Sequence, residues 1–181
     1  MKRIALAAAL LAVIPALAQQ GAAEKAARGK YIVTTSGCND CHTPWVLGPK
    51  GPEPDMTRML SGHPAADRLP PPPKPAGPWI MTAAATNTAW SGPWGISYTA
   101  NLTPDKATGI GKWTEKEFRD TIRTGRHLGR GRQILPPMPI PMYKNFTDSD
   151  LSAIYAYLQT IPAVANRVPE PTPPAENVAV K

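Results

Sequence analysis

Both cysteines of this 181-residue chain lie close together, at positions 38 and 41, and a histidine follows the second one directly. The motif Cys38-x-x-Cys41-His42 is compatible with a haem attached through thioethers, with a redox dithiol or a disulfide, and with part of a metal site. Each of these sites needs a different fold around it, so the motif constrains the architecture more than any other feature. The rest of the sequence has to distinguish between them.

Proline excludes regular secondary structure from much of the chain. It supplies 23 of the 181 residues, roughly an eighth, against a typical usage of about 5%. Eleven of these prolines fall between positions 44 and 78. We therefore predict that residues 44–100 form a long irregular insertion, partly in polyproline conformation and without strands. Trp79, Trp90 and Trp94 indicate that its second half is partly ordered, because large aromatic side chains are seldom left in solvent.

The first 18 residues have the features of a secretory signal peptide. Lys2 and Arg3 precede an apolar run over residues 4–17 that is short for a membrane span, and Ala-Leu-Ala at 16–18 fits a signal-peptidase site. We expect residues 1–18 to be removed on export to a bacterial periplasm, with an uncleaved anchor as the alternative. Loss of Lys2 and Arg3 lowers the formal net charge from +7 to +5, so the mature protein stays basic.

Local signals predict helices before and after the insertion. The alanine-rich residues 22–35 favour a helix that runs into the cysteine motif, and Gly29 within it indicates close approach of another helix. Thr114 and Glu117 have the spacing of a capping box, and Gly125 is suited to end the helix that they begin.

A last helix is predicted near the C-terminus. Thr147 and Asp150 repeat the cap spacing, and Pro162 is expected to stop the helix. Its apolar residues recur on one face: Leu151, Ile154, Tyr155 and Leu158. We expect residues 166–181 to form a flexible tail.

The spacing of the cysteine motif favours covalent haem. Two thioethers reach the two vinyl groups of the porphyrin, and the adjacent His42 meets the iron. A zinc site would need a further ligand, and neither His63 nor His127 lies at ligand-like spacing. A thioredoxin-like dithiol would need a strand–helix pattern that is absent from the sequence, while a structural disulfide remains an alternative. We predict one haem c, with Cys38 and Cys41 as tethers and His42 as the proximal ligand.

A second axial ligand is expected from the other side of the iron. Met138 lies among Pro136, Pro137 and Pro139, in a rigid segment that cannot form a helix and can hold a thioether in place. Met142 is the alternative ligand. Methionine also fills gaps in protein cores, but the flanking prolines make that role less suitable for Met138.

Two blocks of sequence resemble class I monohaem c-type cytochromes. They are NLTPDKATGIGKWTEKEFRDTIRTGR at 101–126 and PPMPIPMYKNFTDSDLSAIYAYL at 136–158. Similar blocks occur in the cytochrome c domains of periplasmic alcohol and aldehyde dehydrogenase cytochrome subunits. Those subunits usually carry several haem motifs, whereas this chain has one.

The resemblance implies an all-α fold in which a few helices surround one covalent haem. The cytochrome c domain would span residues 19–165, with the proline-rich insertion at 44–100 inside it. The resemblance also implies that Met138 is the distal ligand. Gly29 and Tyr31 would pack against Tyr155 or Tyr157 where the first and last helices cross.

His/Met ligation leaves no open position on the iron, so we predict a periplasmic electron carrier rather than an enzyme. The alternatives are a haem-based enzyme or small-ligand sensor, and an electron-transfer subunit of a dehydrogenase complex. Asn101 and Trp113 are candidate partners of a haem propionate, with ordinary loop capping as the alternative. We expect an apolar haem pocket lined by Tyr31, Trp94, Leu102, Trp113, Phe118, Ile122 and Leu135.

Basic residues are concentrated between positions 112 and 132. Only three acidic residues oppose them in this segment, so it is a candidate docking surface for redox partner proteins with an acidic face. A solvated helix face is the alternative, and no base-stacking pattern indicates a nucleic-acid partner. The basic residues are Lys112, Lys116, Arg119, Arg123, Arg126, Arg130 and Arg132.

Overall fold

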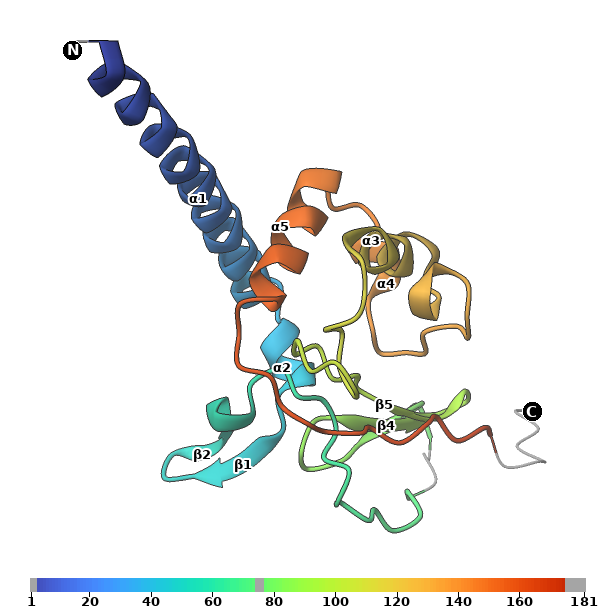
Figure 1. Ribbon diagram of the computed structural model, residues 1–181. Coiled ribbons are helices and arrows are strands. Elements are labelled where there is room, and N and C mark those ends of the chain that lie inside the picture. The colour runs from blue at the N-terminus through green and yellow to red at the C-terminus, as the bar shows by residue number, and fades with distance from the viewer. Residues whose placement is uncertain (1–2, 74–76, 175–181) are drawn as a thin grey trace.

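The computed structural model describes residues 3–73 and 77–174 (Figure 1). Its α-helices are α1 (Arg3–Thr35), α2 (Cys38–His42), α3 (Glu115–Thr124), α4 (Ile140–Tyr143) and α5 (Asp148–Leu158), with short 3-10 helices η1 (Met56–Arg58) and η2 (His127–Gly129). Its strands are β1 (Trp45–Gly48), β2 (Gly51–Pro54), β3 (Thr82–Ala83), β4 (Ala89–Gly92) and β5 (Gly95–Tyr98).

The first helix is longer than the sequence predicts. It starts at Arg3, and its N-terminal part extends away from the rest of the molecule (Figure 1). Within the described ranges, none of the helices combines the length and the apolar character needed to cross a bilayer. Removal of residues 1–18 as a signal peptide stays a prediction.

The second half of α1 packs against α5, as the sequence predicts from Gly29. A Cβ built on Gly29 would lie 1.9 Å from the carbonyl oxygen of Ala153 and 2.8 Å from Cβ of Tyr157. Only glycine allows this approach, so the predicted contact with Tyr157 is confirmed. The prediction for Tyr31 is wrong, because its side chain is 60% exposed and lies under the guanidinium of Arg28, 5.6 Å away.

The caps of α3 and α5 are confirmed. Thr114 Oγ1 accepts a hydrogen bond from the backbone N–H of Glu117 at 3.1 Å, and the Glu117 carboxylate accepts one from the N–H of Thr114 at 3.0 Å. Gly125 ends α3 with φ of 66°. Thr147 caps α5, which ends at Leu158, before Pro162 is reached.

Two small antiparallel sheets correct the expectation of an all-α fold. β1 pairs with β2, and β4 lies between β3 and β5. Both sheets fall within residues 44–100, where we expected no strands. Strands of two to four residues, several containing Gly or Pro, are too short to show an alternating pattern. Trp90 is 5% exposed, which confirms the ordering of this half, whereas Trp79 is 72% exposed.

The chain after α5 corrects the prediction of a flexible tail over its described part. Asn166 is hydrogen-bonded through its backbone and its side chain, and Thr172 forms a β-bridge with Ile96. These partners lie far away in the sequence and carry no local signal. Residues 175–181 of the predicted tail lie outside the described residues.

The core lies between the second half of α1, α3 and α5. Its buried apolar residues come from these helices and from neighbouring loops: Ile32, Val33, Leu60, Ile110, Phe118, Ile122, Tyr143, Leu151, Ile154, Leu158 and Ile161. One side of this core opens into a cavity.

Candidate functional site

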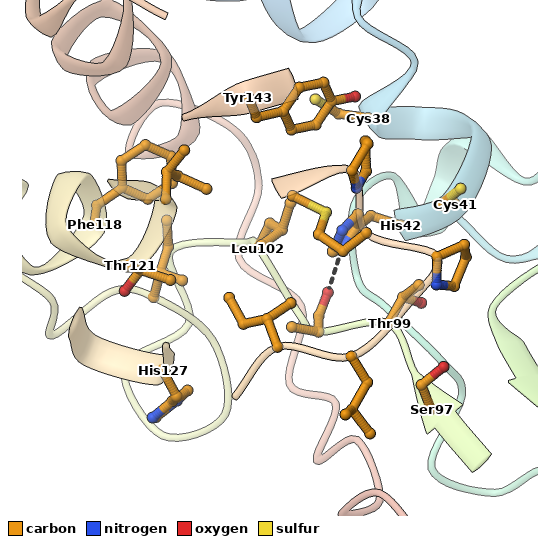
Figure 2. A pocket seen from close by; sticks show the side chains of 18 of the residues that line it. Cys38, Cys41, His42, Ser97, Thr99, Leu102, Phe118, Thr121, His127 and Tyr143 are labelled. Atoms are coloured by element: carbon orange, nitrogen blue, oxygen red, sulfur yellow. Dashed lines mark hydrogen bonds between the residues drawn. The ribbon is translucent and has the colours of Figure 1, made fainter. Parts of the chain in front are cut away.

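The cavity lies beside the cysteine motif and is almost entirely apolar. It contains about 1370 Å³ of empty space, including the solvent space at its mouth. Its walls come from α1, α2, α3, α5, β5 and the loop before α4 (Figure 2). Arg132 is the one Asp, Glu, Lys or Arg among its described lining residues.

The short helix α2 brings the cysteine motif to the cavity wall. Gly37 precedes α2 with φ of 72°, a left-handed conformation that glycine adopts without steric cost. Cys38, Cys41 and His42 then line the cavity together. After the helix, Thr43 Oγ1 accepts from the backbone N–H of Leu60 at 2.9 Å and fixes the exit of the chain.

The imidazole of His42 is oriented by the backbone. Its Nδ1 donates to the carbonyl oxygen of Ala100 at 2.8 Å, dashed in Figure 2. Because a carbonyl can only accept, Nδ1 carries the proton and Nε2 keeps its lone pair. The side chain is 8% exposed, and burial lowers the pKa of His42, although the bond to Ala100 acts in the opposite direction. A neutral imidazole held this way has the arrangement typical of a histidine metal ligand.

Cys38 and Cys41 are not joined by a disulfide. Burial raises the pKa of Cys38 to about 11, and nearby Cys41 and Asp40 add to the increase. Burial and Asp40 also raise the pKa of Cys41. A redox dithiol needs a thiolate near neutral pH, which requires a lowered pKa. The electrostatics of this site therefore disfavour the dithiol alternative.

Of the two candidate methionines, only Met138 is among the residues that line the cavity. Pro136, Pro137 and Pro139 line it as well, and the carbonyl oxygen of Pro136 accepts from Ser97 Oγ at 2.6 Å. This bond attaches the methionine loop to β5. The side chain of Met142 is 60% exposed.

Most of the predicted pocket residues do line the cavity. The prediction is confirmed for Leu102, Trp113, Phe118, Ile122 and Leu135. It is wrong for Tyr31, which lies on the exposed side of α1, while Val33 of the same helix faces the cavity. It is also wrong for Trp94, whose Nε1 donates to Ser97 Oγ at 3.2 Å; Trp90 lines the cavity in its place.

Asn101 does not line the cavity, which corrects its assignment as a propionate partner. Its Oδ1 accepts from the backbone and hydroxyl of Thr103 at 3.0 and 2.7 Å. Its Nδ2 donates to the carbonyl oxygen of Val164 at 2.8 Å. The amide is 4% exposed and connects two loops, which is the structural alternative. Trp113 remains a candidate for that role.

The lining residues that the sequence did not predict include His127, Arg132 and Pro171. His127 packs edge-on against Trp113, with ring centroids 5.2 Å apart, and its pKa is lowered by burial and by Arg132. Its backbone N–H donates to the carbonyl oxygen of Arg132 at 2.9 Å. No local signal marks these positions, because a loop and the C-terminal segment bring them to the cavity.

The basic segment is more neutralised than its sequence indicates. Arg123 and Arg132 pair with acidic residues outside the segment, Asp148 and Glu170. Four of its seven cations form ion pairs: Lys116–Asp120 at 2.5 Å, Arg123–Asp148 at 2.6 Å, Arg130–Glu117 at 3.6 Å and Arg132–Glu170 at 3.2 Å. The segment is thus a weaker positive surface than predicted.

The donor set fits a haem c. Two thiols, an imidazole with a free lone pair and a thioether face one apolar cavity. Among the described residues, no cluster of three or more His, Cys, Asp and Glu side chains is arranged to hold a metal ion by itself. These residues therefore suit a metal that is already held by a macrocycle, such as the iron of a haem.

Comparison with curated proteins finds cytochrome subunits of dehydrogenases. The chain is 31% identical over 130 residues to the gluconate 2-dehydrogenase cytochrome c subunit of Pantoea cypripedii, across 72% of this chain and 22% of that protein. It is 40% identical over 72 residues to the fructose dehydrogenase cytochrome subunit of Gluconobacter japonicus, across 40% of this chain and 15% of that protein.

A third match is to the quinone-dependent alcohol dehydrogenase cytochrome c subunit of Gluconobacter oxydans, with 28% identity over 130 residues, across 72% of this chain and 20% of that protein. Each match therefore spans less than a quarter of the relative's length. No protein-family model matches the chain.

Proposed function

From the relationship of this chain to the cytochrome c subunits of dehydrogenases, we propose that it is a class I c-type cytochrome that carries single electrons. The observation that carries the proposal is the joint presence of Cys38, Cys41, His42 and Met138 on one apolar cavity. These residues come from segments about a hundred positions apart. A core methionine or a structural thiol would not require the other three.

The chain's own residues have separate roles in this proposal. Cys38 and Cys41 tether the group at one end of the cavity, and Ala100 orients His42 so that Nε2 is available as a ligand. Met138 would supply the second ligand from a loop attached to β5 through Ser97. When bound, haem c supplies a one-electron couple at its iron. The apolar wall excludes water and so favours the less charged, reduced state.

The proposed location and partners follow from sequence and charge. Residues 1–18 act as a signal peptide, and the mature chain works in the periplasm, where it exchanges electrons with other redox proteins. A dehydrogenase catalytic subunit is one such partner. Lys112, Arg119 and Arg126 take no part in the ion pairs of the described residues, and they form the remaining positive part of the docking surface.

Carbon monoxide distinguishes this function from a haem-based enzyme or ligand sensor. With both axial positions filled, the reduced full-length protein should not bind carbon monoxide, whereas Met138→Ala should bind it readily. Absorption spectroscopy of the two reduced proteins measures this. Ready binding by the full-length protein would overturn the carrier function and favour the sensor or enzyme.

A further inference from the structure

The segment that follows α5 is anchored firmly at its beginning, at Asn166. The side-chain Nδ2 of Asn166 donates to the carbonyl oxygens of Ser61 and His63 at 2.7 and 2.9 Å. Its Oδ1 accepts from the backbone N–H of Ala65 at 2.9 Å. Asn166 thereby satisfies three backbone groups of a distant loop. Such a residue fixes the path of the chain rather than ending a mobile tail.

A second anchor lies at Thr172. Its backbone N–H donates to the carbonyl oxygen of Ile96 at 3.0 Å, and its carbonyl oxygen accepts from the N–H of Ile96 at 2.8 Å. A Cβ built on the neighbouring Gly95 would lie 2.0 Å from the Thr172 oxygen and 2.6 Å from the carbonyl carbon of Pro173. Strand β5 therefore has a residue without a side chain where the segment crosses it.

Between these anchors one residue of the segment reaches the cavity wall. Pro171 is one of the lining residues, and the Glu170 carboxylate accepts from Nε of Arg132, another lining residue, at 3.2 Å. His127, whose backbone is bonded to that of Arg132, lies across the cavity from Cys38 and Cys41 (Figure 2). The segment thus lies beside the end of the cavity that is remote from the cysteines.

We propose that residues 166–174 form a strap that closes this end of the cavity and limits the access of water and small redox reagents to the group bound there. The inference rests on the proposed function for the identity of that group, but not for the closure itself. Outer-sphere electron transfer requires close approach of the reagent, so Pro171 at the cavity wall and the Glu170–Arg132 pair beside it should slow electron exchange with the bound group. A covered edge also keeps the dielectric around the site low.

Two truncated chains test the strap as a matched pair. One ends after Arg167 and lacks Glu170, Pro171 and Thr172, and the control ends after Pro174 and keeps the whole strap. Both are made with haem-attachment machinery, and their haem content is measured as the pyridine haemochrome. Stopped-flow mixing with an anionic reagent, ferricyanide, and with a cationic cobalt complex then gives the electron-exchange rates, corrected for measured midpoint potentials.

The strap predicts that the chain ending after Arg167 reacts several-fold faster than full-length protein with both reagents, and that the control matches full-length protein. Equal rates for all three proteins would overturn the proposal. A rate that rises with one reagent and falls with the other would also overturn it, because that pattern reports only the lost charge of Glu170.

Amide hydrogen exchange provides a readout that does not involve electron transfer. In the full-length chain the N–H of Ile96 should be protected, and Thr172→Pro, which removes the donor to Ile96, should accelerate its exchange. Thr172→Pro also replaces the chain that ends after Arg167 in the electron-exchange test, if that shorter chain fails to fold. Faster exchange without faster electron transfer in a haem-loaded variant would overturn the strap as a barrier. A full-length chain without haem overturns the proposed function, and the amide exchange then still reports on the closure.

Discussion

At the scale of single residues, His42 and the two cysteines show how local environment selects between chemistries. Burial of the ring favours a neutral imidazole, and the bond from Nδ1 to Ala100 leaves the lone pair of that neutral ring on Nε2. Burial of Cys38 and Cys41 favours protonated thiols, which are poor redox nucleophiles. The same burial therefore suits a neutral imidazole as a ligand, and it opposes a redox dithiol.

Substitution of the two methionines tests the assignment of the second ligand. Met138→Ala should abolish the long-wavelength charge-transfer band of a methionine-ligated ferric haem and lower the midpoint potential, because a thioether ligand favours the reduced state. Met142→Ala is the matched control, and both properties should be unchanged because its side chain is 60% exposed. Spectroscopy and a redox titration measure both. The opposite pattern would transfer the ligand role to Met142.

At the scale of helices and strands, structure fixed by neighbouring residues could be predicted from the sequence, and structure fixed by distant pairings could not. The capping box of Thr114 and Glu117 and the end at Gly125 depend on residues within one or two turns, so the sequence contains the whole interaction. Strands β1 to β5 depend on backbone pairing between segments without an alternating pattern. The wrong assignment of Tyr31 has a similar cause, because helical spacing does not say which face of α1 meets the cavity.

The close crossing of α1 and α5 predicts that one methyl group added at Gly29 lowers the stability of the protein. Gly29→Ala should lower the free energy of unfolding by about 1–3 kcal/mol, because the new Cβ overlaps the backbone of α5 and the helices have to separate. Gly21→Ala, in the same helix, is the control, since nothing lies within 4 Å of its Cβ position. Thermal unfolding measures both variants. Equal stability of the two would contradict the close approach at Gly29.

The same crossing predicts a pH dependence through Asp150. Its carboxylate accepts from the Thr147 hydroxyl and from Arg28 of α1, both at 2.9 Å, and these bonds hold its pKa below the ordinary value of 3.8. A lowered folded-state pKa stabilises the protein above the unfolded pKa, and the contribution is lost as the pH falls through the folded value.

Asp150→Asn should therefore lower the free energy of unfolding by up to about 1 kcal/mol at neutral pH, the range of exposed ion pairs. In strong acid the substitution should leave the free energy of unfolding unchanged. Thermal unfolding across pH gives the difference between wild type and variant. A difference that persists unchanged in acid would mean that the charge of Asp150 has no part in the stabilisation.

At the scale of the whole molecule, the sequence predicted the residues at the cavity better than the segment that closes one end of it. Cys38, Cys41, His42 and Met138 were identified from spacing and from flanking prolines, and the structure places all four at one cavity. The strap, with Asn166 and Thr172 as anchors, was predicted as a flexible tail. Its bonds join positions about 75 to 105 apart, and such pairings leave no periodic pattern in one chain.

The distribution of charge predicts a moderate response of partner exchange to salt. Electron transfer with an acidic redox protein should slow as ionic strength rises, because the chain is basic. Arg119→Glu should slow it further at low salt, whereas Arg130→Gln, which removes a cation already paired with Glu117, should have a smaller effect. Stopped-flow rates across a salt series measure this. Rates independent of salt would exclude an electrostatic docking surface.

This chain should carry one haem c, bound covalently through Cys38 and Cys41. The most direct measurement is the pyridine haemochrome spectrum of full-length protein made with haem-attachment machinery, after extraction with acidified organic solvent. One haem per chain should stay with the protein and show the spectrum of a haem whose two vinyl groups are saturated. The Cys38→Ala/Cys41→Ala variant should lose covalent haem. A full-length protein without haem, or one whose haem is extracted, would contradict this assignment.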